Sequence, residues 1–283
     1  MVEMGRVGVW SGLRSWDAGA VGAAAAAVES SGYGALWIPG GAGGDVLDRC
    51  RAALDATTDL AVATGILNIW RHDAREVAAE TASLRAAGGD RFVVGLGVSH
   101  ERLIGAEYVA PLAKMRSYLD ELDATGQSAD VRVLAALRPR MLELARSRSA
   151  GAHPYFVPPE HSAVARAALG PGPLLAPEQT VVLEPDPTEG RALARQFCAR
   201  YLPLPNYTDN LRALGYTDED LTPPGSDRLV DAIVAWGSAA AIGSRVQAHL
   251  DAGADHVCVQ VVRADDGPPE AHVWQELAGA LPH

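Results

Sequence analysis

Residues 60–97 read LAVATGILNIWRHDAREVAAETASLRAAGGDRFVVGLG, and this stretch decides the fold. Leu60–Thr64 is a short apolar run that favours a strand, and Arg91–Leu96 is a second one. Ala74–Ala87 between them has the composition of a helix, which ends at the turn Gly88-Gly89-Asp90. Strands that are apolar on both faces and are joined by a helix predict a parallel sheet covered by helices.

The same alternation continues along the chain. Eight strands are predicted, at Val7–Trp10, Ala35–Ile38, Leu60–Thr64, Arg91–Leu96, Val131–Leu137, Pro154–Val157, Thr180–Glu184 and His256–Val262. Eight repeats favour an α/β fold of the closed (β/α)8 TIM-barrel type, in one domain of residues 1–283, over an open doubly wound sheet. No GxGxxG follows the first strand, as a Rossmann domain would require. The stretch Leu202–Gly225, rich in Pro and Asn, is predicted to be an insertion on the barrel before its last βα units.

Composition and charge exclude several classes of protein. The formal net charge is −11 with no basic tail, so we expect neither nucleic acid nor an anionic membrane as a partner. The N-terminus lacks the apolar segment of a signal peptide, and no apolar run reaches the roughly 18 residues of a membrane span. The three cysteines fit no paired pattern, which is typical of buried thiols in a reducing compartment. We therefore expect a cytoplasmic protein.

The active site of such a barrel lies at the C-terminal ends of its strands. In this sequence those ends carry tryptophans, glycines and a few polar side chains, namely Trp10, Trp37, Gly65, Ile66, Asn68, Gly97, Ser99, His100 and Glu184. Glycines let a flat ligand approach the backbone, so the set indicates an aromatic cofactor pocket, although core packing explains Trp37 equally well. No HExxH or GxSxG occurs, and His153 and His161 are interpreted as hydrogen-bonded side chains, so we expect no metal site.

A second group of residues could bind an anion. Four arginines surround a short turn, which consists of Ser149, Ala150, Gly151 and Ala152. A glycine-bearing turn with free N–H groups can cradle a phosphate, and arginines add positive charge. A basic helix that ends at a C-cap glycine explains the same pattern, and spacing alone leaves both interpretations open.

Several motifs resemble a known family. Residues 63–70 (ATGILNIW) and 95–100 (GLGVSH) resemble the bacterial luciferase-like monooxygenase superfamily and, more narrowly, a family of probable F420-dependent oxidoreductases of actinobacteria. The resemblance extends over nearly the whole chain, with further matches at residues 115–120 (MRSYLD), 151–156 (GAHPYF), 175–179 (LAPEQ), 226–236 and 252–257 (AGADHV). It implies an enzyme that transfers a hydride between coenzyme F420, a deazaflavin, and a small organic substrate.

The resemblance also implies roles for individual residues. In deazaflavin members the third strand ends in a bulge with a non-proline cis peptide that backs the ring, which here would join Gly65 and Ile66. Ser99 and His100 would lie near the ring or its ribityl chain, and the cofactor phosphate would meet the Ser149–Ala152 turn. Relatives often carry an acidic residue, or an Asp-His pair, after the second strand, where this chain has the loop Gly40-Gly41-Ala42-Gly43-Gly44. His100 or Glu184 would then handle the proton.

Two other functions remain open on the same fold. An FMN-dependent luciferase-like monooxygenase would share the ring pocket, since fold does not fix function. A cofactor-binding homologue with little turnover is also compatible with the glycine-rich loop. Relatives commonly form homodimers, and we expect the same assembly here.

Overall fold

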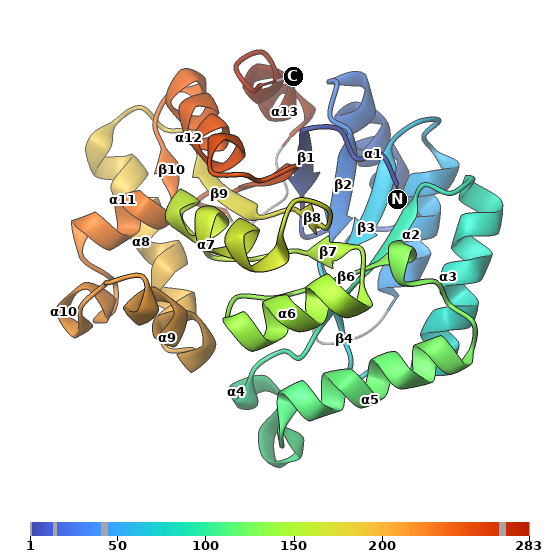
Figure 1. The fold of residues 1–283 in the computed structure, drawn as a ribbon. Coiled ribbons are helices and arrows are strands. Elements are labelled where there is room, and N and C mark those ends of the chain that lie inside the picture. Colours follow the sequence, from blue (N-terminus) through green and yellow to red (C-terminus); the bar gives the residue numbers. More distant parts are fainter. Residues whose placement is uncertain (1, 14–15, 41–44, 266–269, 283) are drawn as a thin grey trace.

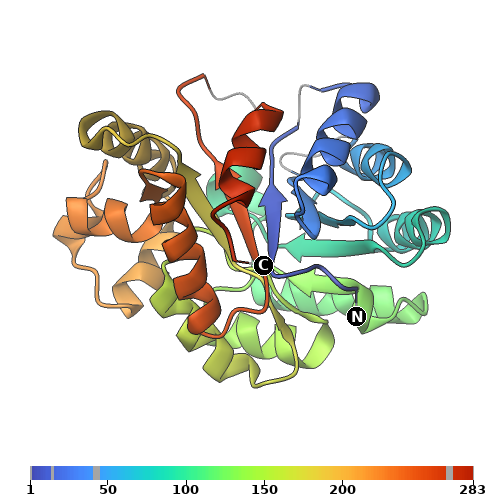
Figure 2. The same cartoon turned by 90° about the horizontal axis from the view of Figure 1, so that it is seen from above.

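The computed structural model describes residues 2–13, 16–40, 45–265 and 270–282. A parallel sheet curls around a central axis and helices cover its outer face (Figures 1 and 2). This arrangement confirms the predicted TIM-barrel class. Of the glycine-rich loop, residues 41–44 lie outside the described residues.

The strands are β1 Val7–Trp10, β2 Ala35–Ile38, β3 Ala61–Thr64, β4 Leu67–Asn68, β5 Phe92–Gly97, β6 Arg132–Leu134, β7 Gly151–Ala152, β8 Leu174–Leu175, β9 Glu178–Val182, β10 Ala235–Trp236 and β11 Val257–Val261. The helices are α1 Ala18–Ser30, α2 Val46–Asp55, α3 Ala74–Gly88, α4 Glu101–Ile104, α5 Pro111–Ala124, α6 Pro139–Arg148, α7 Pro159–Leu169, α8 Pro187–Tyr201, α9 Pro205–Ala213, α10 Asp218–Leu221, α11 Asp227–Ile233, α12 Ala239–Asp251 and α13 Ala271–Ala278. Two short 3₁₀ turns, η1 Gly105–Glu107 and η2 Ala129–Val131, complete the described elements. Among the described residues, none of these helices is long and apolar enough to cross a membrane.

The strand order runs β10-β9-β11-β1-β2-β3-β5-β6-β7-β8. The ring of strands closes because β8 and β9 are parts of one stretch, residues 174–182. On one side the Leu174 amide donates to the Ala150 carbonyl at 2.8 Å, and on the other the Leu175 carbonyl accepts from the Asp255 amide at 2.9 Å. The same stretch therefore pairs with β7 on one side and with β11 on the other, and β10 pairs with the end of β9.

The third strand contains a bulge at its C-terminal end. Ala63 pairs with Val93, and pairing resumes at Leu67 with Leu96, so β3 and β4 span four residues where β5 spans three. The Thr64 hydroxyl replaces the missing ladder bonds, because it donates to the Gly95 carbonyl at 2.9 Å and accepts from the Gly95 amide at 2.8 Å. The extra residue turns the backbone of residues 65 and 66 toward the barrel interior.

The predicted sixth strand, Pro154–Val157, is misplaced. The strand is Gly151–Ala152, and the apolar run after it cannot extend because Phe156 has a left-handed backbone with φ of 60°. The predicted insertion Leu202–Gly225 is present and is largely helical, with α9 and α10 lying together at one side of the barrel (Figure 1).

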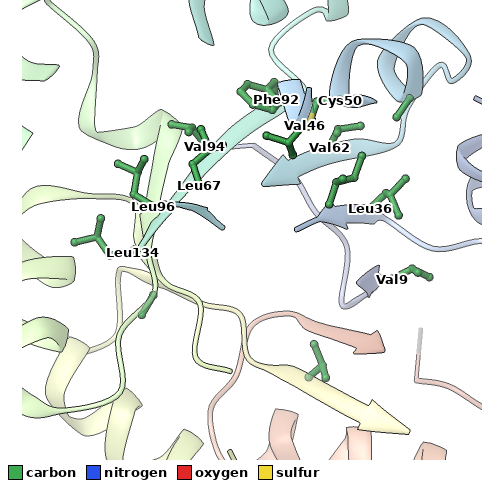
Figure 3. Packing of buried hydrophobic residues seen from close by; sticks show 14 of the residues in the cluster. Val9, Leu36, Val46, Cys50, Val62, Leu67, Phe92, Val94, Leu96 and Leu134 are labelled. Atoms are coloured by element: carbon green, nitrogen blue, oxygen red, sulfur yellow. The ribbon is translucent and has the colours of Figure 1, made fainter. Parts of the chain in front are cut away.

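Alternate side chains of the strands face the helices and the barrel interior. Leu36 and Val62 face outward, where Val46 and Cys50 of α2 pack in the same apolar cluster (Figure 3). Trp37 faces inward and is fully buried, in a separate cluster where most of its neighbours are small. All three cysteines are buried free thiols.

Trp37 lies between two histidines inside the barrel. Its ring stacks on the His153 ring with centroids 4.3 Å apart, and its Nε1 donates to His256 Nε2 at 3.1 Å. Room for this arrangement comes from Gly8, where a Cβ would lie 2.7 Å from His256 Nε2. The interior is therefore filled by one indole and two imidazoles.

Glycine at position 151 is required by the sheet itself. A Cβ there would lie 1.9 Å from the Leu174 carbonyl oxygen, and the residue has a positive φ of 157°. We expect Gly151→Ala to lower the free energy of unfolding by about 1–3 kcal/mol or more, measured by urea denaturation. Gly172→Ala, where no atom lies within 4 Å of the added Cβ, is the matched control and should change it by less than about 0.5 kcal/mol. Equal stability of the two variants would contradict this account of β7.

Buried histidines should make the fold sensitive to acid. Burial lowers the pKa of His153 and His256 to about 4 and that of His249 to about 3. The unfolded chain takes up protons on these imidazoles below about pH 6.5, whereas the folded chain does not. The free energy of unfolding should therefore be highest above about pH 6.5. It should fall as the pH drops toward 4, by about 3 kcal/mol at most for each of these histidines. Urea denaturation at a series of pH values measures the loss, which His249→Gln should reduce. A flat profile between pH 7 and 4 would show that these imidazoles are not the cause.

Candidate functional site

A cavity of about 670 Å³ opens at the C-terminal ends of the strands, where barrels carry their chemistry. The strand ends and the segments that follow them, including Leu103 of α4, contribute Trp10, Pro39, Gly65, Ile66, Asn68, Arg71, Gly97, Val98, Ser99, His100, Leu103, Ala135, Ala136, Leu137, His153 and Tyr155. The insertion and the end of α8 contribute Tyr201, Leu204, Asn206 and Tyr207. These insertion residues are absent from the sequence-based predictions, because no local pattern shows where an insertion folds back.

The bulge of the third strand forms the floor of the cavity. The peptide bond between Gly65 and Ile66 is cis, as expected, and Trp10 Nε1 donates to the Gly65 carbonyl at 3.0 Å. A Cβ on Gly65 would lie 2.6 Å from Trp10 Nε1, and one on Gly97 would lie 2.5 Å from the Ile66 side chain. These glycines make room for the protein's own bulge, and both also line the cavity.

His153 follows β7 and its ring is almost wholly buried. Its Nδ1 lies 2.7 Å from the Ala176 carbonyl oxygen. A carbonyl only accepts, so Nδ1 carries the proton and Nε2 has a free lone pair. Burial lowers the pKa of this imidazole to about 4, which keeps it neutral near pH 7.

His100 stands at the rim, after the end of β5. Asn206 of α9 places its Nδ2 at 3.3 Å from the Ser99 carbonyl and at 3.4 Å from both His100 Nδ1 and the Tyr108 hydroxyl. The Ser99 carbonyl needs a donor, which supports the amide orientation with Nδ2 on this side. If Nδ2 also donates to His100 Nδ1, His100 carries its proton on Nε2. Burial lowers the pKa of His100, so it too is a neutral imidazole.

Tyrosines form part of the cavity wall. Tyr155 donates to Gln260 Oε1 at 2.7 Å and lies 2.8 Å from the Tyr201 hydroxyl. Tyr207 packs against the His100 ring with centroids 5.0 Å apart. Glu178 lies buried on β9, where burial raises its pKa to about 8, so this carboxyl is protonated at neutral pH. No carboxylate is among the described lining residues of the cavity.

The structure does not bring all the predicted residues to this cavity. Trp37 lies wholly buried beneath it, stacked on His153, and does not line it. Glu184 follows β9, and its carboxylate accepts from the Asp186 amide at 2.9 Å, away from the lining residues. His100 and Glu184, the two predicted candidates for proton handling, are therefore separated, and only His100 reaches the cavity.

The predicted phosphate cradle is also corrected. Ala150 donates its amide to the Arg132 carbonyl, at the beginning of β6, so the turn lies at the N-terminal end of the sheet, opposite the cavity. The Ser149 amide donates to the Ala145 carbonyl and the Gly151 amide to the Ser149 hydroxyl. Gly151 and Ala152 form β7, so the turn is a helix end that leads into a strand.

One arginine lies near the cavity instead. Arg71 follows the bulge, is exposed, and is the only side chain with a permanent charge among the described lining residues. A guanidinium at this position can bind the phosphate of a ligand.

The structure is thus a barrel with a ligand cavity at its strand ends. Its sequence and its fold both resemble those of known proteins. Residues 2–133 match the family model of luciferase-like monooxygenase, which confirms the resemblance to that superfamily. A search of curated protein sequences finds no match.

Solved structures share the fold at low sequence identity. An F420-dependent secondary alcohol dehydrogenase in complex with an F420-acetone adduct superposes with a TM-score of 0.75 at 13% identity, over 99% of both chains. The coenzyme F420 dependent tetrahydromethanopterin reductase from Methanopyrus kandleri has a TM-score of 0.73 at 13% identity, over 99% of this chain and 98% of that one. The oxygenating constituent of 3,6-diketocamphane monooxygenase from Pseudomonas putida, in complex with FMN, has a TM-score of 0.70 at 15% identity, over 98% and 96%.

The contact between Asn206 and His100 is directly testable. We expect Asn206→Asp to raise the pKa of His100 by roughly one unit or more, because a carboxylate beside Nδ1 favours the charged imidazole. NMR titration of the His100 ring measures this, with His100→Gln to assign the signal and Asn206→Ala to remove the contact. If the pKa of His100 is the same in the wild type, in Asn206→Asp and in Asn206→Ala, Asn206 does not act on the imidazole.

Proposed function

We propose that this protein is an oxidoreductase that transfers a hydride between coenzyme F420 and a small organic substrate. The observation that carries the proposal is the lining of the cavity. Its walls are largely aromatic and apolar, and its polar groups are neutral imidazoles, hydroxyls and amides together with the single guanidinium of Arg71 among the described lining residues. A volume of about 670 Å³ is within the usual range for a cofactor site, and such a lining fits a flat ring system.

The choice of F420 is supported by the family resemblance and by two structural neighbours that are named as F420-dependent. An FMN-dependent monooxygenase is the second candidate, because another neighbour is in complex with FMN. A cofactor-binding homologue with little turnover is the third.

Different residues of the cavity would contact different parts of such a cofactor. Gly65 and Ile66 would back the ring, Trp10 and Asn68 would border it, and Arg71 would hold its phosphate. When bound, the deazaflavin supplies the carbon that gives or takes the hydride. His100 can hold the proton that accompanies the substrate oxygen, because a neutral imidazole both donates and accepts. We further propose that the protein acts as a homodimer.

Titration of the purified protein with F420 and with FMN tests the proposal. We expect F420 to bind at least about ten-fold more tightly, measured by cofactor fluorescence, and its reduced form to be oxidised in a single turnover with an electron-accepting substrate. Arg71→Glu should weaken the binding of either phosphate-bearing cofactor about ten-fold or more, whereas Arg75→Glu on α3, outside this cavity, should not.

Three other results would point elsewhere. Tighter binding of FMN, with oxygen-dependent turnover, would identify a monooxygenase. Tight binding of F420 without turnover on any carbonyl or alcohol substrate would identify a carrier. Binding of neither cofactor would remove the proposed function.

A further inference from the structure

We propose that His153 is a ligand-binding residue whose Nε2 accepts a hydrogen bond from an N–H donor on the ring of the bound cofactor. The inference rests on the proposed function and adds to it a contact at the floor of the cavity. Flavins and deazaflavins both carry such a donor in the imide of their pyrimidine ring, so the chemistry applies to either cofactor.

The tautomer of His153 is fixed by the protein. Its Nδ1 has to donate to the Ala176 carbonyl at 2.7 Å, which leaves the lone pair of Nε2 available. Nε2 is buried and has no hydrogen-bond partner among the described residues. A buried acceptor without a donor costs free energy, so such an atom beside a cavity indicates a ligand.

Neighbouring donors of the protein are used elsewhere. Trp37 stacks on the imidazole, but its indole N–H donates to His256 Nε2. Trp10 also lines the cavity, and its indole N–H donates to the Gly65 carbonyl. Gly65 keeps the nearby space free, because a Cβ there would lie 3.4 Å from His153 Nε2. The donor for Nε2 must therefore come from outside these side chains.

The other buried imidazoles give a comparison. In His249 both ring nitrogens have partners, Ser162 Oγ at 2.8 Å and Gln179 Oε1 at 2.9 Å. His161 resembles His153, because one of its ring nitrogens, Nε2, lies within hydrogen-bond distance of a carbonyl, that of Leu137. Its other nitrogen, Nδ1, has no partner among the described residues. His161 does not line the cavity, so it provides a matched control.

Two substitutions at position 153 separate the two ring nitrogens. His153→Asn places an amide N–H near the position of Nδ1 and keeps a donor for the Ala176 carbonyl, but it removes the acceptor. His153→Gln places an amide oxygen near the position of Nε2 and restores an acceptor. His161→Gln keeps an N–H for the Leu137 carbonyl and removes only the unpartnered nitrogen.

The experiment measures dissociation constants of F420 and FMN for the full-length wild type and these variants, together with their unfolding transitions. We expect His153→Asn to raise the dissociation constant about ten-fold or more, His153→Gln to recover part of the loss, and His161→Gln to leave it unchanged. In the folded wild type, the ¹⁵N resonance of His153 Nε2 should shift on cofactor binding as this atom gains a hydrogen bond.

The outcomes keep this inference apart from the proposed function. If wild type binds a cofactor and folded His153→Asn binds it equally well, with no shift at Nε2, His153 is a core residue and the inference fails. If all three variants weaken binding equally, the effect is one of packing and the inference also fails. If wild type binds neither cofactor, the proposed function itself fails.

Discussion

The packing of Trp37 inside the barrel is the interaction on which the rest of the structure depends. The indole fills the axis of the curled sheet, with one imidazole stacked on its face and another accepting its N–H. This arrangement requires neutral histidines, since burial disfavours the charged form of both His153 and His256. It also fixes the height of the cavity floor, because His153 is at once a neighbour of Trp37 and part of the lining.

The site is built from the floor upward. A one-residue bulge directs the backbone of Gly65 and Ile66 into the interior, and the Thr64 hydroxyl satisfies the backbone groups that lose their partners. Glycines at the strand ends then allow the neighbouring side chains to close around the bulge. At the rim, His100 lies after the end of β5 and contacts Asn206 and Tyr207 of α9.

The sequence carried most of the fold and only part of the site. Alternating apolar strands and helices predicted the barrel, because these patterns are local. The Ser149–Ala152 turn was predicted wrongly, since a glycine before a strand and a glycine in an anion cradle give the same short pattern. The hydrogen bond from Ala150 to the Arg132 carbonyl and the pairing of Gly151 with Leu174 distinguish them. Tyr201 and Tyr207 could not be predicted, because their place depends on how a long insertion folds back over distant strand ends.

The segment from α8 to α11 also has an apolar cluster of its own. Phe197, Leu211 and Leu229 belong to an apolar cluster separate from the main one, which joins the barrel through a few residues such as Phe156 and Val182. The wall of the cavity and its floor are thus stabilised by different sets of contacts. Because the two clusters are separate, the shape of the wall can change in evolution while the shape of the floor is kept.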